Sequence, residues 1–383
     1  KEPGTSFSDT YCRYTTIPDA NFEAELEALG YDDISGDGQV PTALIEVVTS
    51  LNVSGRSITD LTGIEDFTAL QDLNCSSNSL TALDVSNNIN LTDLSVGNNS
   101  LTALNVSTLS NLESLNFHSN SVASIDVTNN PLLDTLKFYD NYTISALDLS
   151  NNPLLEDLEI RNNLLTELDL SNNPLLTRVQ VQFNSLTSLD LSNQVGLVTL
   201  RVNDNNLTYL NVKNGNNTNV IAFNTTNNAS LSCVLVDDAT YSSTNWTDID
   251  GTTNFSDTYC RYTAIPDANF EAALEALGYD DITGDGQVPT VLIEVITDLN
   301  VAGQSIADLT GIEDFIALQT LVCASNTFTS LDLSNSPELT SVNTKFTPLT
   351  NLNISNTFIN LFNFKHSNLF TTALRNQLNF FLK

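Results

Sequence analysis

The sequence repeats itself every 21 residues, and this period decides what the chain can fold into. Apolar residues recur at fixed positions of each repeat, which in the first repeat hold Leu70, Leu73, Cys75, Leu80, Leu83 and Val85. Eight repeats follow one another, one of them a residue longer, and they start at Leu70, Leu91, Leu112, Leu133, Leu155, Leu176, Leu197 and, in degenerate form, Thr218. Because one repeat alone cannot bury its apolar residues, successive repeats must stack as coils.

Two features of each repeat predict how a coil is built. Apolar residues two positions apart, such as Leu73 and Cys75, point to the same side of a short strand. The ninth residue is asparagine in seven repeats, at Asn78, Asn99, Asn120, Asn141, Asn163, Asn184 and Asn205. Such a column of amides can bond to the backbone of neighbouring coils, and Asn-Asn-Pro runs mark the return turns. The sequence therefore predicts a leucine-rich-repeat solenoid, β-rich, with short parallel strands on its concave face.

A second, longer repeat organises the whole chain. Residues 7–75 recur as residues 255–323 with 12 differences over 69 positions. In the first copy Asp19 can cap a short helix that presents Phe22, Leu26 and Leu29 on one face. We interpret these segments as small helical amino-terminal caps and expect two tandem modules. The predicted division is a cap and first long repeat (1–69), eight repeats (70–238), a linker and second cap (239–317), and further repeats with a carboxy-terminal cap or interface (318–383).

Several motifs suggest a family. Residues 61–70 read Leu-Thr-Gly-Ile-Glu-Asp-Phe-Thr-Ala-Leu, residues 17–22 read Ile-Pro-Asp-Ala-Asn-Phe, and Leu-Thr-x-Leu-Asp-Val/Leu-Ser-Asn-Asn recurs between repeats. These motifs resemble those of the secreted, internalin-like leucine-rich-repeat proteins of the Bacteroidota. The resemblance implies a secreted or cell-surface adhesion or recognition module whose partner is an extracellular protein or glycan. The tandem duplication keeps an alternative open: a structural spacer or filament subunit that assembles end to end.

Composition excludes several functions. Aspartate and glutamate number 46 against 13 lysines and arginines, and the net charge of −33 excludes nucleic-acid binding. No stretch approaches the roughly 20 apolar residues of a membrane span, so no membrane insertion is expected. Only two histidines, His118 and His366, occur, and nucleophile-elbow and phosphate-loop motifs are absent from the sequence. We therefore expect no enzymatic activity and no required cofactor.

The outward positions of the concave strands change composition along the stack. The early repeats hold small polar residues there, whereas the middle repeats hold four of the chain's 13 basic residues. The candidate ligand-binding residues are Lys137, Tyr139, Glu159, Arg161, Arg178, Gln180, Gln182, Phe183 and Arg201. Scarce cations beside aromatic rings indicate a binding surface. The alternative is pairing across strands alone, of Lys137 with Glu159 and of Arg161 with Asp140.

Two acidic features are candidate cation sites. Asp33, Ser35, Asp37 and Gln39 occupy ligand positions of an EF-hand-type calcium loop, and the second copy supplies Asp281, Thr283, Asp285 and Gln287. Both copies lack the final glutamate of such a loop, so possible calcium binding stands beside a simple Asx-rich turn. A column of Asp84, Asn105, Asp126, Asp148, Asp169, Asp190 and Asn211 is expected either to close Asx turns or to bind divalent cations weakly.

The five cysteines make an odd number. Cys75 and Cys323 occupy an inward position of the repeat and are predicted to be buried thiols. Cys233 and Cys260 are predicted to form a disulfide, as suits an oxidising compartment. Cys12, the counterpart of Cys260, is expected to have no partner in this chain.

The carboxy terminus is rich in phenylalanine. Seven of the chain's 18 phenylalanines lie from Phe346 onward, and a helix is predicted from Thr371. Since the end of an open solenoid must be covered, this segment is expected either to cap the stack or to contact another subunit. The second option predicts head-to-tail self-association.

Overall fold

The computed structural model describes residues 13–357. The chain divides into two compact units, Lys1–Thr258 and Tyr259–Lys383, each with its own apolar core. Cys12 and the predicted helix from Thr371 lie outside the described residues.

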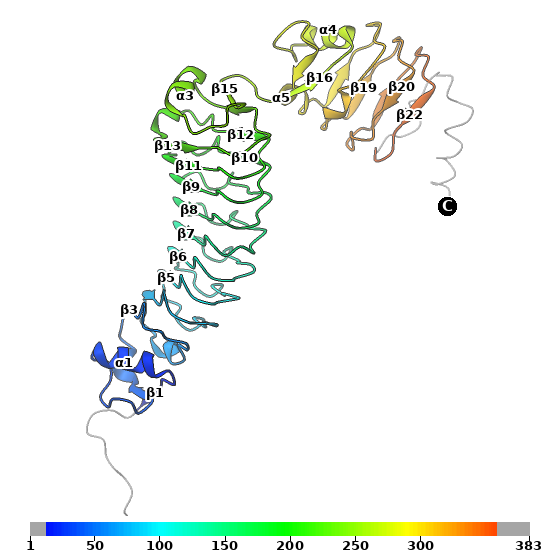
Figure 1. Cartoon of the computed structure of the whole chain (residues 1–383). Helices are drawn as coiled ribbons and strands as arrows, with labels where there is room; N and C mark the ends of the chain where they lie inside the picture. Colours follow the sequence, from blue (N-terminus) through cyan, green and yellow to red (C-terminus); the bar gives the residue numbers. More distant parts are fainter. Residues whose placement is uncertain (1–12, 358–383) are drawn as a thin grey trace, which may run out of the picture. The chain divides into compact units, whose positions relative to one another are not determined.

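The first unit is a stack of coils with a long parallel sheet along one side (Figure 1). Its nine strands are, in order, β3 (Ser50–Asn52), β4 (Asp72–Asn74), β5 (Asp93–Ser95), β6 (Ser114–Asn116), β7 (Thr135–Lys137), β8 (Asp157–Glu159), β9 (Arg178–Gln180), β11 (Thr199–Arg201) and β13 (Ala222–Asn224). Neighbouring strands pair at a spacing of one repeat, since Leu73 pairs with Leu94 and Leu94 with Leu115. The predicted leucine-rich-repeat solenoid is therefore confirmed, and this sheet is its concave sheet.

The middle residue of each strand builds the core. In β7 Leu136 is fully buried, whereas Thr135 and Lys137 on either side are half-buried at the surface. Two residues beyond the middle of the strand, Phe117 and Phe138 of adjacent coils stack with their ring centroids 5.2 Å apart. Each coil thus covers the apolar residues of the next, which a single coil could not do.

An asparagine ladder joins the coils. The Nδ2 of Asn120 donates to the backbone carbonyls of Val96, at 3.1 Å, and Phe117, at 3.0 Å. Its Oδ1 accepts the backbone N–H of Leu101 at 3.0 Å. One side chain therefore bonds its own coil to the preceding one, as the asparagine column predicts.

The eighth coil departs from the sequence-based register. Leu200 pairs with Phe223, so the spacing there is longer and the predicted start at Thr218 is wrong by two residues. The extra residues lie in the return turn, which holds the 3-10 helix η2 (Asn217–Asn219). Asn228 consequently continues the ladder, because its amide donates to two backbone carbonyls and accepts one backbone N–H.

The other sides of the coils carry a second sheet and a second set of amides. A parallel sheet of four strands contains β10 (Ser188–Asp190), β12 (Tyr209–Asn211), β14 (Cys233–Leu235) and β15 (Asn254–Ser256). Fully buried amides at the return turns belong to Asn88, Asn130, Asn152, Asn173 and Gln194. The Nδ2 of Asn130, for example, donates to the carbonyls of Val106 and Leu109 at 3.0 and 2.8 Å. These turns are where the Asn-Asn-Pro runs predict them.

A small cap precedes the coils. It contains β1 (Tyr14–Thr16) antiparallel to β2 (Gln39–Pro41), α1 (Ala20–Ala28) and α2 (Thr42–Ile45), and the 3-10 helix η1 (Ile64–Asp66) follows β3 in the first coil. Asp19 caps α1 as predicted, because its Oδ1 accepts two backbone N–H groups of the first turn. Phe22 and Leu26 are buried, whereas Leu29, the C-cap residue, is 43% exposed. The helix ends there because Gly30 turns the chain with φ +83°.

The first unit closes with α3 (Ala239–Asn245) and the single tryptophan. Trp246 is 3% exposed, its ring stacks on Phe223 with centroids 4.1 Å apart, and its Nε1 donates to the carbonyl of Val220 at 3.2 Å. Trp246 therefore reports on the packing of this unit. Within residues 13–357, no helix has the length and apolar character needed to cross a membrane.

The second unit repeats the cap and begins another stack. Its elements are β16 (Tyr262–Ala264), α4 (Ala268–Ala276), β17 (Gln287–Pro289), α5 (Thr290–Ile293), β18 (Asp298–Asn300), η3 (Ile312–Asp314), β19 (Thr320–Val322), β20 (Ser330–Asp332), β21 (Ser341–Asn343) and β22 (Asn351–Asn353). Asp267 caps α4 as Asp19 caps α1. The division between the units falls within the predicted linker and second cap, 239–317, and the other predicted limits stay interpretations of the sequence.

Candidate binding surface on the concave sheet

The concave sheet brings the predicted ligand-binding residues onto four neighbouring strands. They are Lys137 on β7, Glu159 on β8, Arg178 and Gln180 on β9, and Arg201 on β11, with Tyr139, Arg161, Gln182 and Phe183 within three residues of a strand end. Gln180 and Gln182 are each 7% exposed, whereas Phe183 is 48% exposed. The surface therefore combines buried amides with accessible cations and an accessible aromatic ring.

Three flat side chains stack along this surface. The imidazole of His118 lies parallel to the ring of Tyr139, with centroids 4.5 Å apart and an interplanar angle of 8°. On the same ring, the guanidinium carbon of Arg161 lies 4.2 Å from the centroid. A cation over a tyrosine face is attracted by the ring quadrupole. His118, Tyr139 and Arg161 are termed the ring stack.

The sequence prediction missed His118 and the glycine beneath it. A Cβ atom at Gly97 in the preceding coil would lie 2.5 Å from Cδ2 of His118 and closer still to Nε2, so only glycine leaves room for the imidazole. Gly97, His118, Tyr139 and Arg161 occupy the same position of four consecutive repeats. Comparing this position across the repeats, rather than searching for charge, is the signal that could have found both residues.

Acidic residues pair with three of the four cations, but not in the predicted combinations. Nζ of Lys137 lies 2.7 Å from Oδ2 of Asp157, and Nε of Arg178 lies 3.6 Å from Oδ1 of the same carboxylate. The alternative of pairing across strands joined Lys137 to Glu159, which is its Cα partner on the next strand. The long lysine side chain instead reaches the diagonal neighbour, a contact that the geometry of adjacent strands allows.

The second predicted pair is also wrong. Nε of Arg161 lies 3.4 Å from Oε1 of Glu159, two residues earlier in the same coil, and Arg161 makes no ion pair with Asp140. The Asp140 carboxylate instead accepts the side-chain amide of Asn162. Arg201 makes no ion pair with any residue between 13 and 357. Pairing across strands therefore does not account for all four cations.

The histidine of the ring stack is neutral. Burial lowers the pKa of His118 below its ordinary value of 6.5, and the charge of Arg161 lowers it further. Asp140 and Glu159 act in the opposite direction without reversing the shift. At neutral pH the imidazole therefore stacks on Tyr139 as an uncharged ring, so the positive charge of the stack belongs to Arg161.

The column of aspartates and asparagines closes Asx turns, one of its two predicted roles. Oδ1 of Asp84 accepts the backbone N–H of Ser86 at 2.9 Å, and the contact to the residue two positions on recurs at Asn105, Asp126, Asp148, Asp169, Asp190 and Asn211. Hydrogen bonds from the hydroxyl and the backbone N–H of the following serine or threonine lower the pKa of Asp84, Asp126 and Asp148. The Asx-turn prediction is confirmed.

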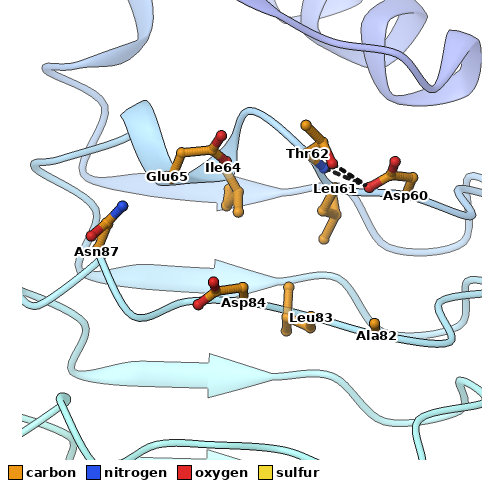
Figure 2. A pocket seen from close by; sticks show the side chains of 9 residues that line it. All are labelled: Asp60, Leu61, Thr62, Ile64, Glu65, Ala82, Leu83, Asp84 and Asn87. Atoms are coloured by element: carbon orange, nitrogen blue, oxygen red, sulfur yellow. Dashed lines mark hydrogen bonds between the residues drawn. The ribbon is translucent and has the colours of Figure 1, made fainter.

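A hollow of about 380 Å³ lies beside this column in the first coils (Figure 2). Asp60, Glu65 and Asp84 line it. Asp60 accepts the backbone N–H and the hydroxyl of Thr62, each at 2.8 Å, and Glu65 accepts the N–H of Gly63 at 2.8 Å. Each carboxylate thus closes its own turn, and the described lining residues include no cation. This hollow therefore lacks, among its described lining residues, the basic side chains that the concave sheet presents.

The predicted calcium loops fold as turns whose candidate ligands contact protein groups. Asp37 accepts the backbone N–H and the side-chain amide of Gln39, each at 3.1 Å. Ser35 donates to a glutamate of α1 at 2.8 Å, and Asp33 accepts a tyrosine hydroxyl at 3.2 Å. In the second copy the same contacts involve Asp281, Thr283, Asp285 and Gln287. In the described part of the chain no three histidine, cysteine, aspartate or glutamate side chains are placed to hold a metal ion, and calcium binding stays a prediction.

The cysteines fall into two chemical states. Cys75 and Cys323 are buried free thiols, as predicted, and burial raises the pKa of each to about 12. Cys233 and Cys260 are both disulfide-bonded. Their pairing with each other stays the sequence-based prediction.

The stacked coils, the asparagine ladder and the parallel concave sheet define the chain as a leucine-rich-repeat solenoid protein. No family model matches it. Over 83 residues, which are 22% of this chain and 8% of the relative, it is 35% identical to internalin J of Listeria monocytogenes. The match therefore spans less than a tenth of that relative's own length.

Solved structures of similar proteins include two internalins of the same organism. The functional domain of InlJ from Listeria monocytogenes is 24% identical over 91% of this chain and 75% of that one, with a TM-score of 0.44. The internalin InlF from Listeria monocytogenes is 18% identical over 92% of this chain and 97% of that one, with a TM-score of 0.46. The strand register of the chain itself carries the fold assignment.

Proposed function

We propose that this chain is a non-enzymatic recognition module that binds a protein or glycan ligand through its concave sheet. The observation that carries the proposal is the ring stack and the cations around it. In a chain of net charge −33, Lys137, Arg161, Arg178 and Arg201 belong to four neighbouring coils of the concave sheet, and Arg161 lies over the ring of Tyr139. Arginine and aromatic side chains are the residue types that dominate the energetics of binding interfaces.

The charge pattern favours a protein over a polyanionic glycan. The cations alternate with Asp157 and Glu159, so a partner with both signs of charge complements the surface. A polymer with a carboxylate on every unit would be repelled by the net charge of the chain.

We infer that the chain acts outside the cytoplasm, as a secreted or cell-surface protein. The disulfide-bonded state of Cys233 and Cys260 supports an oxidising compartment. The resemblance of the repeat motifs to secreted, internalin-like proteins of the Bacteroidota supports the same location. The similarity to internalin J over 83 residues agrees with that resemblance.

A triple substitution tests the function. Arrays of protein ectodomains and glycans are probed with the wild-type chain and with Arg161→Ala/Arg178→Ala/Arg201→Ala. The triple variant should bind at least tenfold more weakly, because charge-assisted hydrogen bonds are lost. Exposed ion pairs contribute only about 0–1 kcal/mol each, so its Tm should stay close to that of the wild type. Unchanged affinity for the ligand found would contradict the assignment.

A matched control uses arginines of the same chain that lie off the concave sheet. Arg13 pairs with Asp66 at 2.8 Å, and Arg56 pairs with Glu25 at 2.8 Å. The double variant Arg13→Ala/Arg56→Ala removes cations in similar ion pairs without touching the proposed surface. It should bind the ligand as the wild type does.

A second candidate function is structural. The near-identical copies 7–75 and 255–323 favour a spacer or filament subunit that assembles end to end. Because a head-to-tail contact need not close, its mass should grow with concentration. Light scattering across a hundredfold range of concentration tests this, and a constant monomer mass would exclude it.

A further inference from the structure

The concave sheet ends in a hollow of about 260 Å³ over its last two strands, β11 and β13. Its lining includes Gln182, Phe183, Arg201, Asn203, Asn224 and Asp248. Space exists because Ala222 occupies in β13 the register position that the large Arg178 occupies in β9. Beyond β13 the chain segment that carries Asp248 borders the hollow, and the backbone carbonyl of Asp248 accepts the N–H of Thr225 at 2.9 Å.

Two polar side chains that line this hollow lack partners among the described residues. Gln182 is 7% exposed, and its Oε1 accepts no hydrogen bond from any described residue. Arg201 is exposed and, among residues 13–357, has no ion-pair partner. A buried amide without a partner is unfavourable, and a guanidinium presents a fork of donors that matches a carboxylate. A ligand that supplies a donor and a carboxylate would satisfy both groups.

Phe183 has a backbone conformation that folding alone does not explain. Its φ is +57°, a left-handed value that bulky residues rarely adopt, and its side chain is 48% exposed. The equivalent residues of the other coils of the first unit share this conformation but are small and polar: Ser77, Asn98, Ser119, Asp140, Asn162, Asp204 and Asn227. In the second unit the same position holds Phe346, whose φ is +63° and whose side chain is 68% exposed. Because a small polar residue would form the same turn with less strain, the ring of Phe183 points to a role in binding.

We propose that this hollow binds the carboxylate side chain of a peptide segment in a protein partner, an inference that rests on the proposed function of the concave sheet. Arg201 donates two hydrogen bonds to the carboxylate, and Gln182 bonds to an amide of the same segment. The ring of Phe183 packs on the aliphatic part of the acidic side chain. Asp248 repels a second carboxylate and attracts a cation, so the segment carries one acidic residue beside a basic one.

Selected peptides test the proposal. The full wild-type chain is used to select binders from a random 12-residue peptide library, and the enriched peptides are synthesised with glutamate and with glutamine at each acidic position. Arg201→Gln should weaken the glutamate peptides at least tenfold. On the wild-type chain, replacing the glutamate of the peptide by glutamine should weaken binding by about the same factor. Arg201→Gln and the glutamine peptide together should bind little more weakly than with either change alone. The affinity of Arg201→Lys for the glutamate peptides should lie between those of the wild type and Arg201→Gln. Lysine keeps the positive charge but cannot donate two parallel hydrogen bonds to one carboxylate.

Two further variants separate binding from folding. Gln182→Leu should weaken the peptides while leaving Tm equal or higher, because an apolar side chain of similar size removes an unsatisfied buried amide. A glutamine with a purely structural role would instead lower Tm when replaced. Arg56→Gln, away from the concave sheet, should leave peptide affinity unchanged.

Several results would overturn the proposal, and they differ from those that overturn the proposed function. If peptides lose affinity with Arg161→Ala/Arg178→Ala but tolerate Arg201→Gln within twofold, the hollow is not the carboxylate site and the concave-sheet function stands. If peptides are indifferent to all three arginines, both fail. If trigalacturonic acid binds more tightly than every peptide and depends on Arg201, the carboxylate comes from a sugar and the peptide assignment is wrong.

Discussion

Replacing Asn120 by alanine is expected to destabilise the first unit by about 3–5 kcal/mol. The alanine variant leaves the backbone N–H of Leu101 without its acceptor, which is Oδ1 of Asn120 at 3.0 Å. The carbonyls of Val96 and Phe117 each lose a donor but retain another, from the asparagines of neighbouring coils. An orphaned buried N–H costs about 1–3 kcal/mol, and each lost hydrogen bond contributes about 1 kcal/mol, which gives the expected sum.

The position of Asn120 in the stack prevents the loss from being relieved. In an array of coils each coil contacts only its neighbours, so an end coil can fray while the rest stays folded. Asn120 lies in the third of the eight predicted coils, with a coil on each side. The variant can therefore give the Leu101 N–H a new partner, such as water, only by opening the middle of the stack.

Urea unfolding followed by the fluorescence of Trp246 measures this effect. Trp246 is the only tryptophan, and it is buried in the same unit as Asn120, so the signal reports on that unit alone. Asn111→Ala is the matched control, since Asn111 is exposed and its amide makes one long contact, 3.4 Å from the carbonyl of Ile89. The control should lose less than about 0.5 kcal/mol. A loss below about 1 kcal/mol for Asn120→Ala, with an unchanged urea dependence, would refute the role of the ladder.

Three further predictions concern the ring stack and the predicted calcium loops. Gly97→Ala should displace the His118 imidazole from Tyr139 and so change the ring-current shifts of His118 in NMR spectra. It should also weaken ligand binding, although no polar group is removed. Unchanged shifts would contradict the predicted clash between the new Cβ atom and His118. Because the folded-state pKa of His118 lies below its ordinary 6.5, the unfolded chain binds the proton more readily, so stability should fall as pH drops through 6.5. His118→Gln should lose this part of the pH dependence in urea titrations between pH 5 and 8. If the loops bind calcium, millimolar calcium should raise the Tm, and the double variant Asp37→Ala/Asp285→Ala should abolish this increase. A Tm that changes with neither calcium nor chelator would favour simple Asx-rich turns.

The inward residues made the fold predictable from sequence. The strand positions follow from the apolar pattern because the same column must be buried in every coil, so one register satisfies all of them. The predicted start of the eighth coil was wrong because the return turn before it is longer. A fixed repeat length therefore placed the start at Thr218. Asn228 was visible in the sequence and marks the correct register, because the ladder needs an amide at that place.

The surface was less predictable because its contacts are not periodic. Lys137 can reach either of two carboxylates on the adjacent strand, and the choice of Asp157 depends on side-chain conformations that spacing does not specify. The hollow at the end of the sheet needs a small residue at Ala222 and a carboxylate at Asp248, which lies 26 residues later in the chain. The composition of the repeats predicted where the cations lie, but it could not show that Ala222 and Asp248 line the same hollow.

Replacing Phe183 should change the stability of the first unit and its affinity for peptides in opposite directions. Outward residues of a solenoid can usually vary without disturbing the core, because the ladder and the inward column carry the fold. Phe183 is different, since its left-handed backbone disfavours a large side chain while asparagine tolerates that conformation. Phe183→Asn should therefore raise the unfolding free energy of the first unit by about 1 kcal/mol and weaken peptide binding. Urea unfolding and peptide titration of the same preparation measure both effects. If the variant is less stable than the wild type, the ring is a packing element and its assignment to the hollow is wrong.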